Sequence, residues 1–219
     1  MINLLIVLFC VTMLYMASSS RIMAQINMLK VQGLLLCAIT LITHSDAKLL
    51  GILFLLLETF AAKAILIPWF LTKVALKNNI RRDSNPQFPN FYTLVVATFI
   101  LFSGFMIANI HSDYLKNISN LYFGISIATI ITSFFFIAIK KKLLTHIIGF
   151  AMLENGIFLL SLSVANEMPW IVNIGVLLDV FVAVFILGLL VGEIGVIYEN
   201  PEVGQISNLK DFEEGEEHA

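Results

Sequence analysis

Cysteine and charge are both scarce in this sequence, and each shortage excludes a class of protein. Only two of the 219 residues are cysteines, Cys10 and Cys37, and no C-x-x-C pair occurs. An iron–sulfur cluster needs four thiolate ligands, so these two residues cannot supply one. The four histidines are scattered along the chain without the spacing of a metal site. We therefore expect no redox centre, no metal and no cofactor held by this chain alone.

The shortage of charge excludes a water-soluble domain. Charged residues make up 13% of the chain and hydrophobic residues 59%, and the mean hydropathy is +0.93. This composition cannot supply the polar surface that a soluble domain of this length needs, so an integral membrane protein is expected. Nothing in the charge pattern indicates binding to nucleic acid.

Long apolar runs dominate what remains, and a helix crosses the bilayer core with about 20 such residues. Seven segments are long enough or nearly so: about 2–19, 27–44, 49–72, 91–110, 119–139, 144–165 and 169–195. None shows the alternation of a barrel strand, so the sequence predicts an all-α transmembrane bundle of about seven spans. The first is read as an uncleaved span, with a cleaved signal as the open alternative. The second is interrupted by Gln32.

The distribution of bases predicts the orientation of the chain. Nine bases lie in alternate connections: Arg21, Lys30, Lys73, Lys77, Arg81, Arg82, Lys140, Lys141 and Lys142. The intervening connections hold only Lys48 and Lys116. By the positive-inside rule the N-terminus lies outside and the C-terminus in the cytoplasm.

Two pairs of matching stretches indicate an internal duplication, although apolar segments also match by chance. "LLETFAAKAIL" (56–66) resembles "LLDVFVAVFIL" (177–187) at an offset of 121, and "VQGLLLCAITL" (31–41) resembles "ENGIFLLSLSV" (154–164) at an offset of 123. We expect two parallel three-helix repeats joined by one span. The predicted parts are repeat 1 (1–76), a cytoplasmic loop (77–90), connector span 4 (91–111), repeat 2 (119–199) and an acidic cytoplasmic tail (200–219).

Four ionisable residues fall well inside the apolar runs, away from their ends: Glu58, Lys63, Glu154 and Asp179. Each costs roughly 2.5–3.5 kcal/mol at the bilayer centre, so they are expected to be paired or functional. Glu58 and Lys63 are five residues apart and do not face each other on a helix, so Glu154 or Asp179 is the expected partner of Lys63. Burial disfavours the charged form of these groups and a nearby opposite charge favours it, which suits a proton relay. A purely structural ion pair is the alternative.

Four further residues are expected to support this path. Pro68 removes a helix hydrogen bond five residues after Lys63 and predicts a kink. Asn155 and Gly156, beside Glu154, offer an amide and a place for close helix approach. His146 is a candidate for leading protons towards Glu154, although an interfacial histidine without that role is the simpler interpretation.

Three stretches resemble a known family, the hydrogenase-4 component E membrane subunits. They are "LTHIIGFAMLENGIFLLSLSV" (144–164), "IGVLLDVFVAVFILGLLVGEI" (174–194) and "FAAKAILIPWFLTKVALKNN" (60–79), the last with the family's Lys-x4-Pro pattern. That family is similar to the K subunit of complex I and the C subunit of Mrp-type antiporters. The resemblance implies that Lys63, Glu154 and Asp179 are the functional positions, and gives no help with Glu58.

The resemblance further implies a subunit of a group 4 hydrogenase or formate hydrogenlyase-type oxidoreductase complex, without a catalytic centre of its own. Its expected partners are antiporter-like and other membrane-arm subunits, peripheral redox subunits bound through the cytoplasmic loops or tail, and the lipid bilayer. The expected location is the bacterial or archaeal cell membrane, the inner membrane where there are two. A structural assembly subunit and a free-standing cation/proton transporter are the alternatives.

Overall fold

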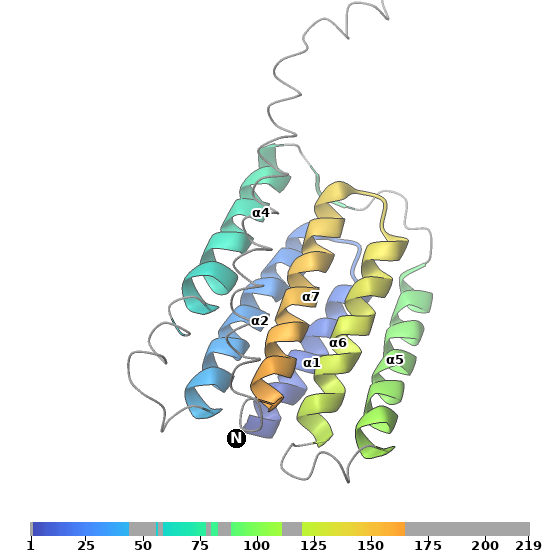
Figure 1. Cartoon of the computed structure of the whole chain (residues 1–219). Coiled ribbons are helices and arrows are strands. Elements are labelled where there is room, and N and C mark those ends of the chain that lie inside the picture. The colour runs from blue at the N-terminus through green and yellow to red at the C-terminus, as the bar shows by residue number, and fades with distance from the viewer. Residues whose placement is uncertain are drawn as a thin grey trace, which may run out of the picture. The chain divides into compact units, whose positions relative to one another are not determined.

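The computed structural model describes residues 2–43, 56, 59–77, 80–82, 89–110 and 120–164. The chain divides into two compact units, Met1–Val180 and Phe181–Ala219, and every described residue belongs to the first. Within these residues the chain is helical and contains no strand (Figure 1). The predicted seventh span (169–195) and the acidic tail lie outside the described residues, as do Glu58 and Asp179.

The described elements are helices separated by short connections. In chain order they are α1 (Ile2–Ser18), α2 (Ile22–Thr43), the π-helix η1 (Thr59–Leu66), α4 (Ile67–Lys77), α5 (Asn90–Ile110), α6 (Asn120–Ile139) and α7 (Leu143–Val164). Four α-helices, α2, α5, α6 and α7, and the continuous η1–α4 segment are each long and apolar enough to cross a membrane, and α1 is a shorter apolar helix. The expectation of a helical membrane protein is therefore supported, while the count of seven spans stays a prediction.

Large apolar side chains cover the outside of the described bundle, as expected of a protein surrounded by lipid. Phe91 and Phe99 on α5 are 70% and 71% exposed, and apolar surface of this extent is not stable in water. Only 22% of the α5 span is buried, against 78% of the α7 span. Helix α7 is therefore central to the described bundle and α5 is peripheral.

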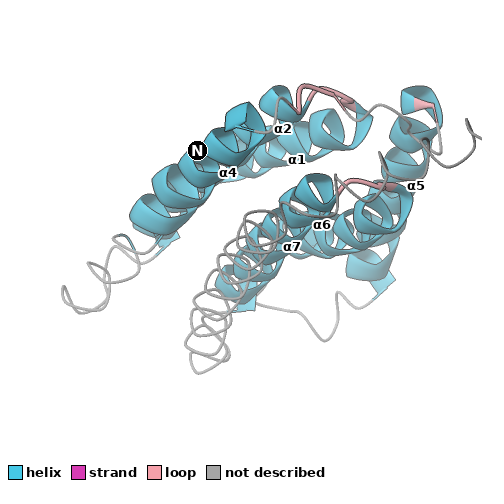
Figure 2. Ribbon diagram, turned by 90° about the horizontal axis from the view of Figure 1, so that it is seen from above, coloured by secondary structure: helices cyan, strands magenta, loops and turns pink. Residues whose placement is uncertain are grey.

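Two helical hairpins form the centre of the described bundle. Helices α1 and α2 pack against each other, as do α6 and α7, and the hairpins meet through α1 with α6 and α2 with α7. The η1–α4 segment packs on α2, and α5 packs on α6 and α1. Figure 2 shows α4, α2 and α1 in one row that faces α6 and α7.

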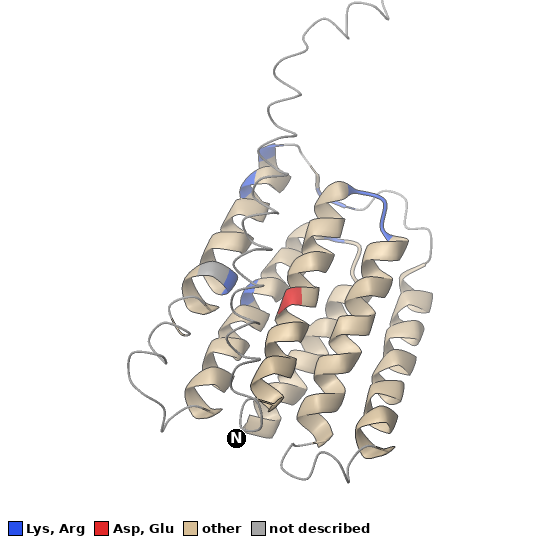
Figure 3. Cartoon of the chain, viewed as in Figure 1, with Lys and Arg blue, Asp and Glu red and all other residues tan. Residues whose placement is uncertain are grey.

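Three basic connections meet at one end of the helices (Figure 3). The backbone of Arg21 pairs with that of Arg82, and the Ile22 N–H donates to the Arg81 carbonyl over 3.3 Å. The Lys142 ammonium donates to the Arg82 carbonyl over 2.6 Å. The connections predicted to be cytoplasmic therefore lie on the same side of the bundle, which is what the charge count requires.

Two predicted boundaries were wrong. Helix α2 begins at Ile22, five residues before the predicted start, because its apolar run is broken by polar residues that the helix accommodates. Lys30, counted above as a base in a connection, lies instead inside this helix. The third segment continues as helix to Lys77 rather than ending at 72.

Candidate intramembrane ion pair

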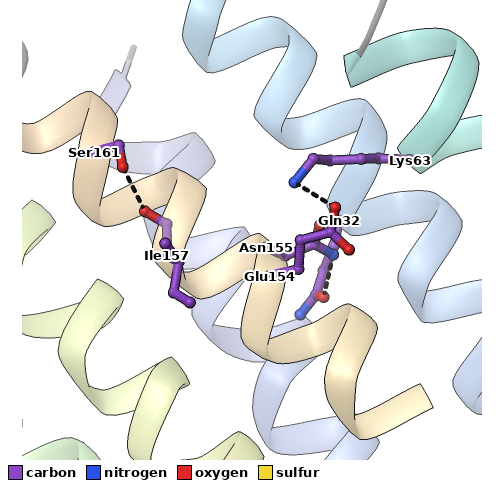
Figure 4. A network of polar contacts seen from close by, with 6 residues as sticks. All are labelled: Gln32, Lys63, Glu154, Asn155, Ile157 and Ser161. Carbon is purple, nitrogen blue, oxygen red and sulfur yellow. Dashed lines mark hydrogen bonds and ion pairs between the residues drawn. The ribbon is translucent and has the colours of Figure 1, made fainter. Parts of the chain in front are cut away.

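Lys63 and Glu154 form an ion pair between the η1–α4 segment and α7 (Figure 4). The Lys63 Nζ atom lies 3.5 Å from Glu154 Oε1, and the two side chains are 2% and 3% exposed. Glu154 is the only acidic residue within the described ranges. The structure thus pairs Lys63 with one of the two carboxylates considered for it.

The pair lies deep in the apolar part of the helices. Glu154 is eleven residues beyond Leu143, the first residue of α7, which corresponds to about 16 Å along the helix axis. The hydrocarbon core is about 30 Å thick, so this position is close to its middle. At that depth an isolated charge is costly, and mutual attraction offsets part of the cost.

An aromatic ring also lies close to the ammonium group. The Lys63 Nζ atom lies 4.7 Å from the centroid of the Phe158 ring, within the range of a cation–π interaction. Phe158 is four residues after Glu154, so both project from the same face of α7. Sequence reasoning did not identify Phe158, and its one signal was this spacing from an intramembrane acid.

A buried amide pair lies beside the ion pair. The Asn155 Nδ2 atom donates to Gln32 Oε1 over 3.1 Å, which joins α7 to α2 (Figure 4). Gln32, the residue that interrupted the second apolar run, is completely buried, and its Oε1 atom accepts this hydrogen bond from another helix. Asn155 supplies the amide that was expected next to Glu154.

Glycines allow the backbones around the pair to approach closely. A Cβ atom at Gly33 of α2 would lie 2.8 Å from the Ala64 nitrogen and 2.9 Å from the Lys63 carbonyl carbon. A Cβ atom at Gly156 of α7 would lie 3.1 Å from the Thr129 methyl group of α6. Gly33 therefore lets η1 pack directly on α2, and Gly156 makes the close approach predicted for it.

Irregular backbone precedes Pro68. Residues Thr59–Leu66 form a π-helix, and regular α-helix resumes at Ile67. Proline has no N–H to donate, and its ring crowds the carbonyl four residues earlier, here that of Ala64. A widened helix is one way to relieve that conflict. The kink predicted at Pro68 stays a prediction, and the irregularity that the structure shows before it is a π-helix that carries Lys63.

The other polar residues of α7 bond to nearby backbone and not to the ion pair. The His146 ring is 2.7 Å from the Lys140 carbonyl through Nε2, and Thr145 donates to the Lys142 carbonyl over 2.6 Å. His146 precedes Glu154 by eight residues, about 12 Å along the helix. Ser161 donates to the Ile157 carbonyl over 3.0 Å. The relay role of His146 stays a prediction, without a direct contact that supports it.

These groups define what the site can do chemically. Within the part of the chain that the structure describes, no three metal-ligating side chains gather. From the described residues, the site has one carboxylate, one ammonium, one aromatic face and two neutral amides. Of these, only the carboxylate and the ammonium exchange protons under ordinary conditions, so proton or charge transfer is the chemistry they support.

Comparison with known proteins gives one distant relative. No family model matches the chain, and no solved structure matches it. The chain is 25% identical over 199 residues, covering 86% of each sequence, to a Mycobacterium tuberculosis protein named as uncharacterized protein Rv0085. The similarity extends along most of both chains, so it is one of whole proteins and not of a shared short motif.

Proposed function

We propose that this chain is a non-redox membrane-arm subunit of a proton- or ion-translocating oxidoreductase complex of the group 4 hydrogenase and complex I-related type. In such a complex it contributes Lys63 and Glu154 to a lateral path for protons. The observation that carries the proposal is the ion pair itself, buried between apolar helices. The resemblance of residues 60–79 and 144–164 to hydrogenase-4 component E supplies the class of complex.

The pair is suited to switching because its two charges depend on each other. While the ammonium is 3.5 Å from the carboxylate, each group stabilises the charged form of the other. A movement that separates them leaves both in apolar surroundings, where the neutral form of each is favoured. When the pair opens, the ammonium therefore gives up one proton and the carboxylate takes one up, and closing the pair reverses both steps and restores both charges. The π-helix that carries Lys63 is a place where such a movement is easier, because its hydrogen-bond pattern differs from the neighbouring α-helix.

The test replaces Glu154 by glutamine in the complex as it exists in native membranes. Redox-driven proton uptake is measured in inverted membrane vesicles, and assembly is measured by the chains that copurify with a tag on this subunit. We expect Glu154→Gln to abolish proton uptake while assembly persists. Ser161→Ala is the matched control, since that hydroxyl lies on the same helix and bonds only to backbone among the described residues.

A structural assembly subunit is the second candidate, because two interhelical polar contacts lie side by side at the same depth. It predicts that Glu154→Gln disrupts assembly and that any complex that does assemble pumps at the normal rate. Loss of copurifying chains without a specific transport defect would therefore reject the proton path and support this role.

A further inference from the structure

Lys30 is a second lysine within a membrane-spanning helix. It lies eight residues beyond Ile22, the first residue of α2, about 12 Å along the helix axis. The hydrocarbon core extends about 15 Å from surface to middle, so Lys30 is near the middle of the membrane if α2 begins at the surface. A lysine side chain reaches about 6 Å towards the interface. Its ammonium group therefore remains inside the hydrocarbon region even when the side chain is fully extended, and a partner there would stabilise the charge.

The position of Lys30 on α2 is at the edge of the helix contact. Gly33, three residues on, faces the backbone of Lys63 and Ala64, while Leu34, four residues on, is 50% exposed. Residues three and four apart are neighbours on a helix surface. Lys30 is itself partly exposed, so it borders both the η1 contact and the outer surface of α2.

Lys30 has no carboxylate to pair with among the residues described. Glu154 is the one acid there, and it is paired with Lys63. The described residues also give Lys30 no hydrogen bond and no aromatic contact. By contrast, the Nζ atom of Lys73, an exposed lysine of α4, lies 5.4 Å from the centroid of the Trp69 ring. An intramembrane charge at a helix surface is costly in lipid and is characteristically met by an opposite charge.

We propose that Lys30 marks a surface where a transmembrane helix of a different protein binds and presents an Asp or Glu carboxylate at mid-membrane depth. The surface consists of Lys30 with the exposed apolar residues Val31 and Leu34 of α2. Charge complementarity selects this occupant over lipid chains, which cannot stabilise the ammonium group. The partner helix then lies about one helical turn from Gly33, the residue that contacts the Lys63 backbone. The proposed interface does not depend on the proton path, and the same contact is expected if this chain is a structural assembly subunit.

A zero-length cross-link tests the partner directly. Dicyclohexylcarbodiimide enters the membrane and activates carboxyl groups, which then form an isopeptide bond with an adjacent lysine and release a urea. Native membranes that contain the wild-type chain are treated with it, and peptides joined through Lys30 are identified by mass spectrometry. We expect an Asp or Glu from a transmembrane segment of another protein. A link to Glu58, Asp179 or any other acid of this same sequence would overturn the proposal.

Variants at Lys30 then measure how much the contact matters. In Lys30→Met the charge is lost, and in Lys30→Glu it is reversed. We expect at least about a tenfold lower yield of the cross-linked partner copurifying with the tagged chain, because truncating one member of a buried charge pair weakens an interface by more than tenfold. Lys30→Arg keeps the charge and should retain the partner. Lys73→Met is the matched control and should leave the yield unchanged.

The outcomes separate the proposal from a lysine that merely extends to the interface. If no isopeptide forms at Lys30 and Lys30→Met copurifies with the same proteins as the wild type, the proposal is wrong. The cross-link uses the wild-type chain, so a variant that fails to fold does not decide the result. Proton uptake is not measured here, so failure of the proposed function leaves this test unaffected.

Discussion

Gln32 and Asn155 hydrogen-bond to each other across the contact of α2 with α7, although 123 positions separate them. The same offset relates the stretches 31–41 and 154–164, in which these two residues are equivalent. Equivalent positions of two repeats touch each other only close to the axis that relates the repeats. The contacts of α1 with α6 and of α2 with α7 also join helices that the predicted repeats would make equivalent, and the duplication itself stays a prediction.

The first prediction concerns the amide pair. Replacing either Gln32 or Asn155 by leucine leaves the other amide without its partner, and interhelical hydrogen bonds in membranes contribute about 1 kcal/mol. We expect each single variant to be less stable by about that amount in detergent micelles titrated with dodecyl sulfate. The double variant Gln32→Asn, Asn155→Gln keeps the combined length of the two side chains, so it should keep the hydrogen bond and most of the stability that the leucine variants lose. If the exchanged variant is no better than the singles, the hydrogen bond is not the cause.

The second prediction concerns the ion pair. Lys63→Met and Glu154→Gln each leave one buried charge without this partner, which we expect to cost roughly 3 kcal/mol of unfolding free energy. The double variant removes both charges and should lose clearly less than the two singles added together, with a coupling of about 1 kcal/mol or more. Unfolding of the four proteins in the same micelles measures the coupling. Strict additivity would show that the two groups do not interact.

The helices were predictable because long apolar runs are strong signals, but the start of α2 and the end of α4 were not. Helix α2 begins at Ile22, and the polar residue of the stretch that was not predicted, Gln25, is buried and donates through Nε2 to the Ser19 carbonyl over 2.6 Å. Hydropathy alone does not reveal that a buried amide is bonded in this way, so the polar residues before the apolar run were taken as part of a connection. Lys30 was likewise assigned to a connection because of its charge, although it lies inside the helix.

The candidate site was partly predictable. Lys63 and Glu154 stand out as ionisable residues in apolar runs, and the geometry of a regular α-helix favoured a partner for Lys63 on another helix over Glu58. Which carboxylate meets Lys63 depends on helix packing, which only the structure supplies. Phe158 is one of 18 phenylalanines, so its identity alone gave no signal. Glu58 and Asp179 lie beyond the residues described, and their roles stay predictions.

The third prediction concerns Gly33, which determines how closely η1 packs on α2. In Gly33→Ala the new methyl group meets backbone atoms of Ala64 and Lys63 at 2.8–2.9 Å, so the two segments must separate. We expect a loss of about 1–3 kcal/mol and a lower yield of the Lys63–Glu154 isopeptide formed by dicyclohexylcarbodiimide. The yield is measured by mass spectrometry of the full chain in membranes.

Gly104→Ala is the matched control for Gly33→Ala. Its methyl group meets the Gly124 carbonyl oxygen at 2.7 Å, an equally close backbone contact, but between α5 and α6. We expect a similar loss of stability with no change in the isopeptide yield. Equal yields in the two variants would show that Gly33 does not position Lys63.

The fourth prediction concerns Phe158, whose ring lies 4.7 Å from the Lys63 ammonium. Fluorine atoms withdraw charge from the ring face with little change in its shape, so they weaken a cation–π interaction while packing is kept. We expect mono-, di- and trifluorophenylalanine at position 158 to lower the unfolding free energy stepwise, by about 1 kcal/mol in total.

Repeating the fluorination series in the Lys63→Met variant distinguishes an effect on the cation–π interaction from an effect on packing. In Lys63→Met the ammonium is absent, so the same three substitutions should leave the unfolding free energy unchanged. A stepwise loss of unfolding free energy both with and without Lys63 would show that fluorination acts through packing and that Phe158 does not stabilise the ion pair. A loss only where Lys63 is present means that the ring stabilises the lysine charge, so that opening the Lys63–Glu154 pair does not leave the ammonium solely in contact with aliphatic side chains.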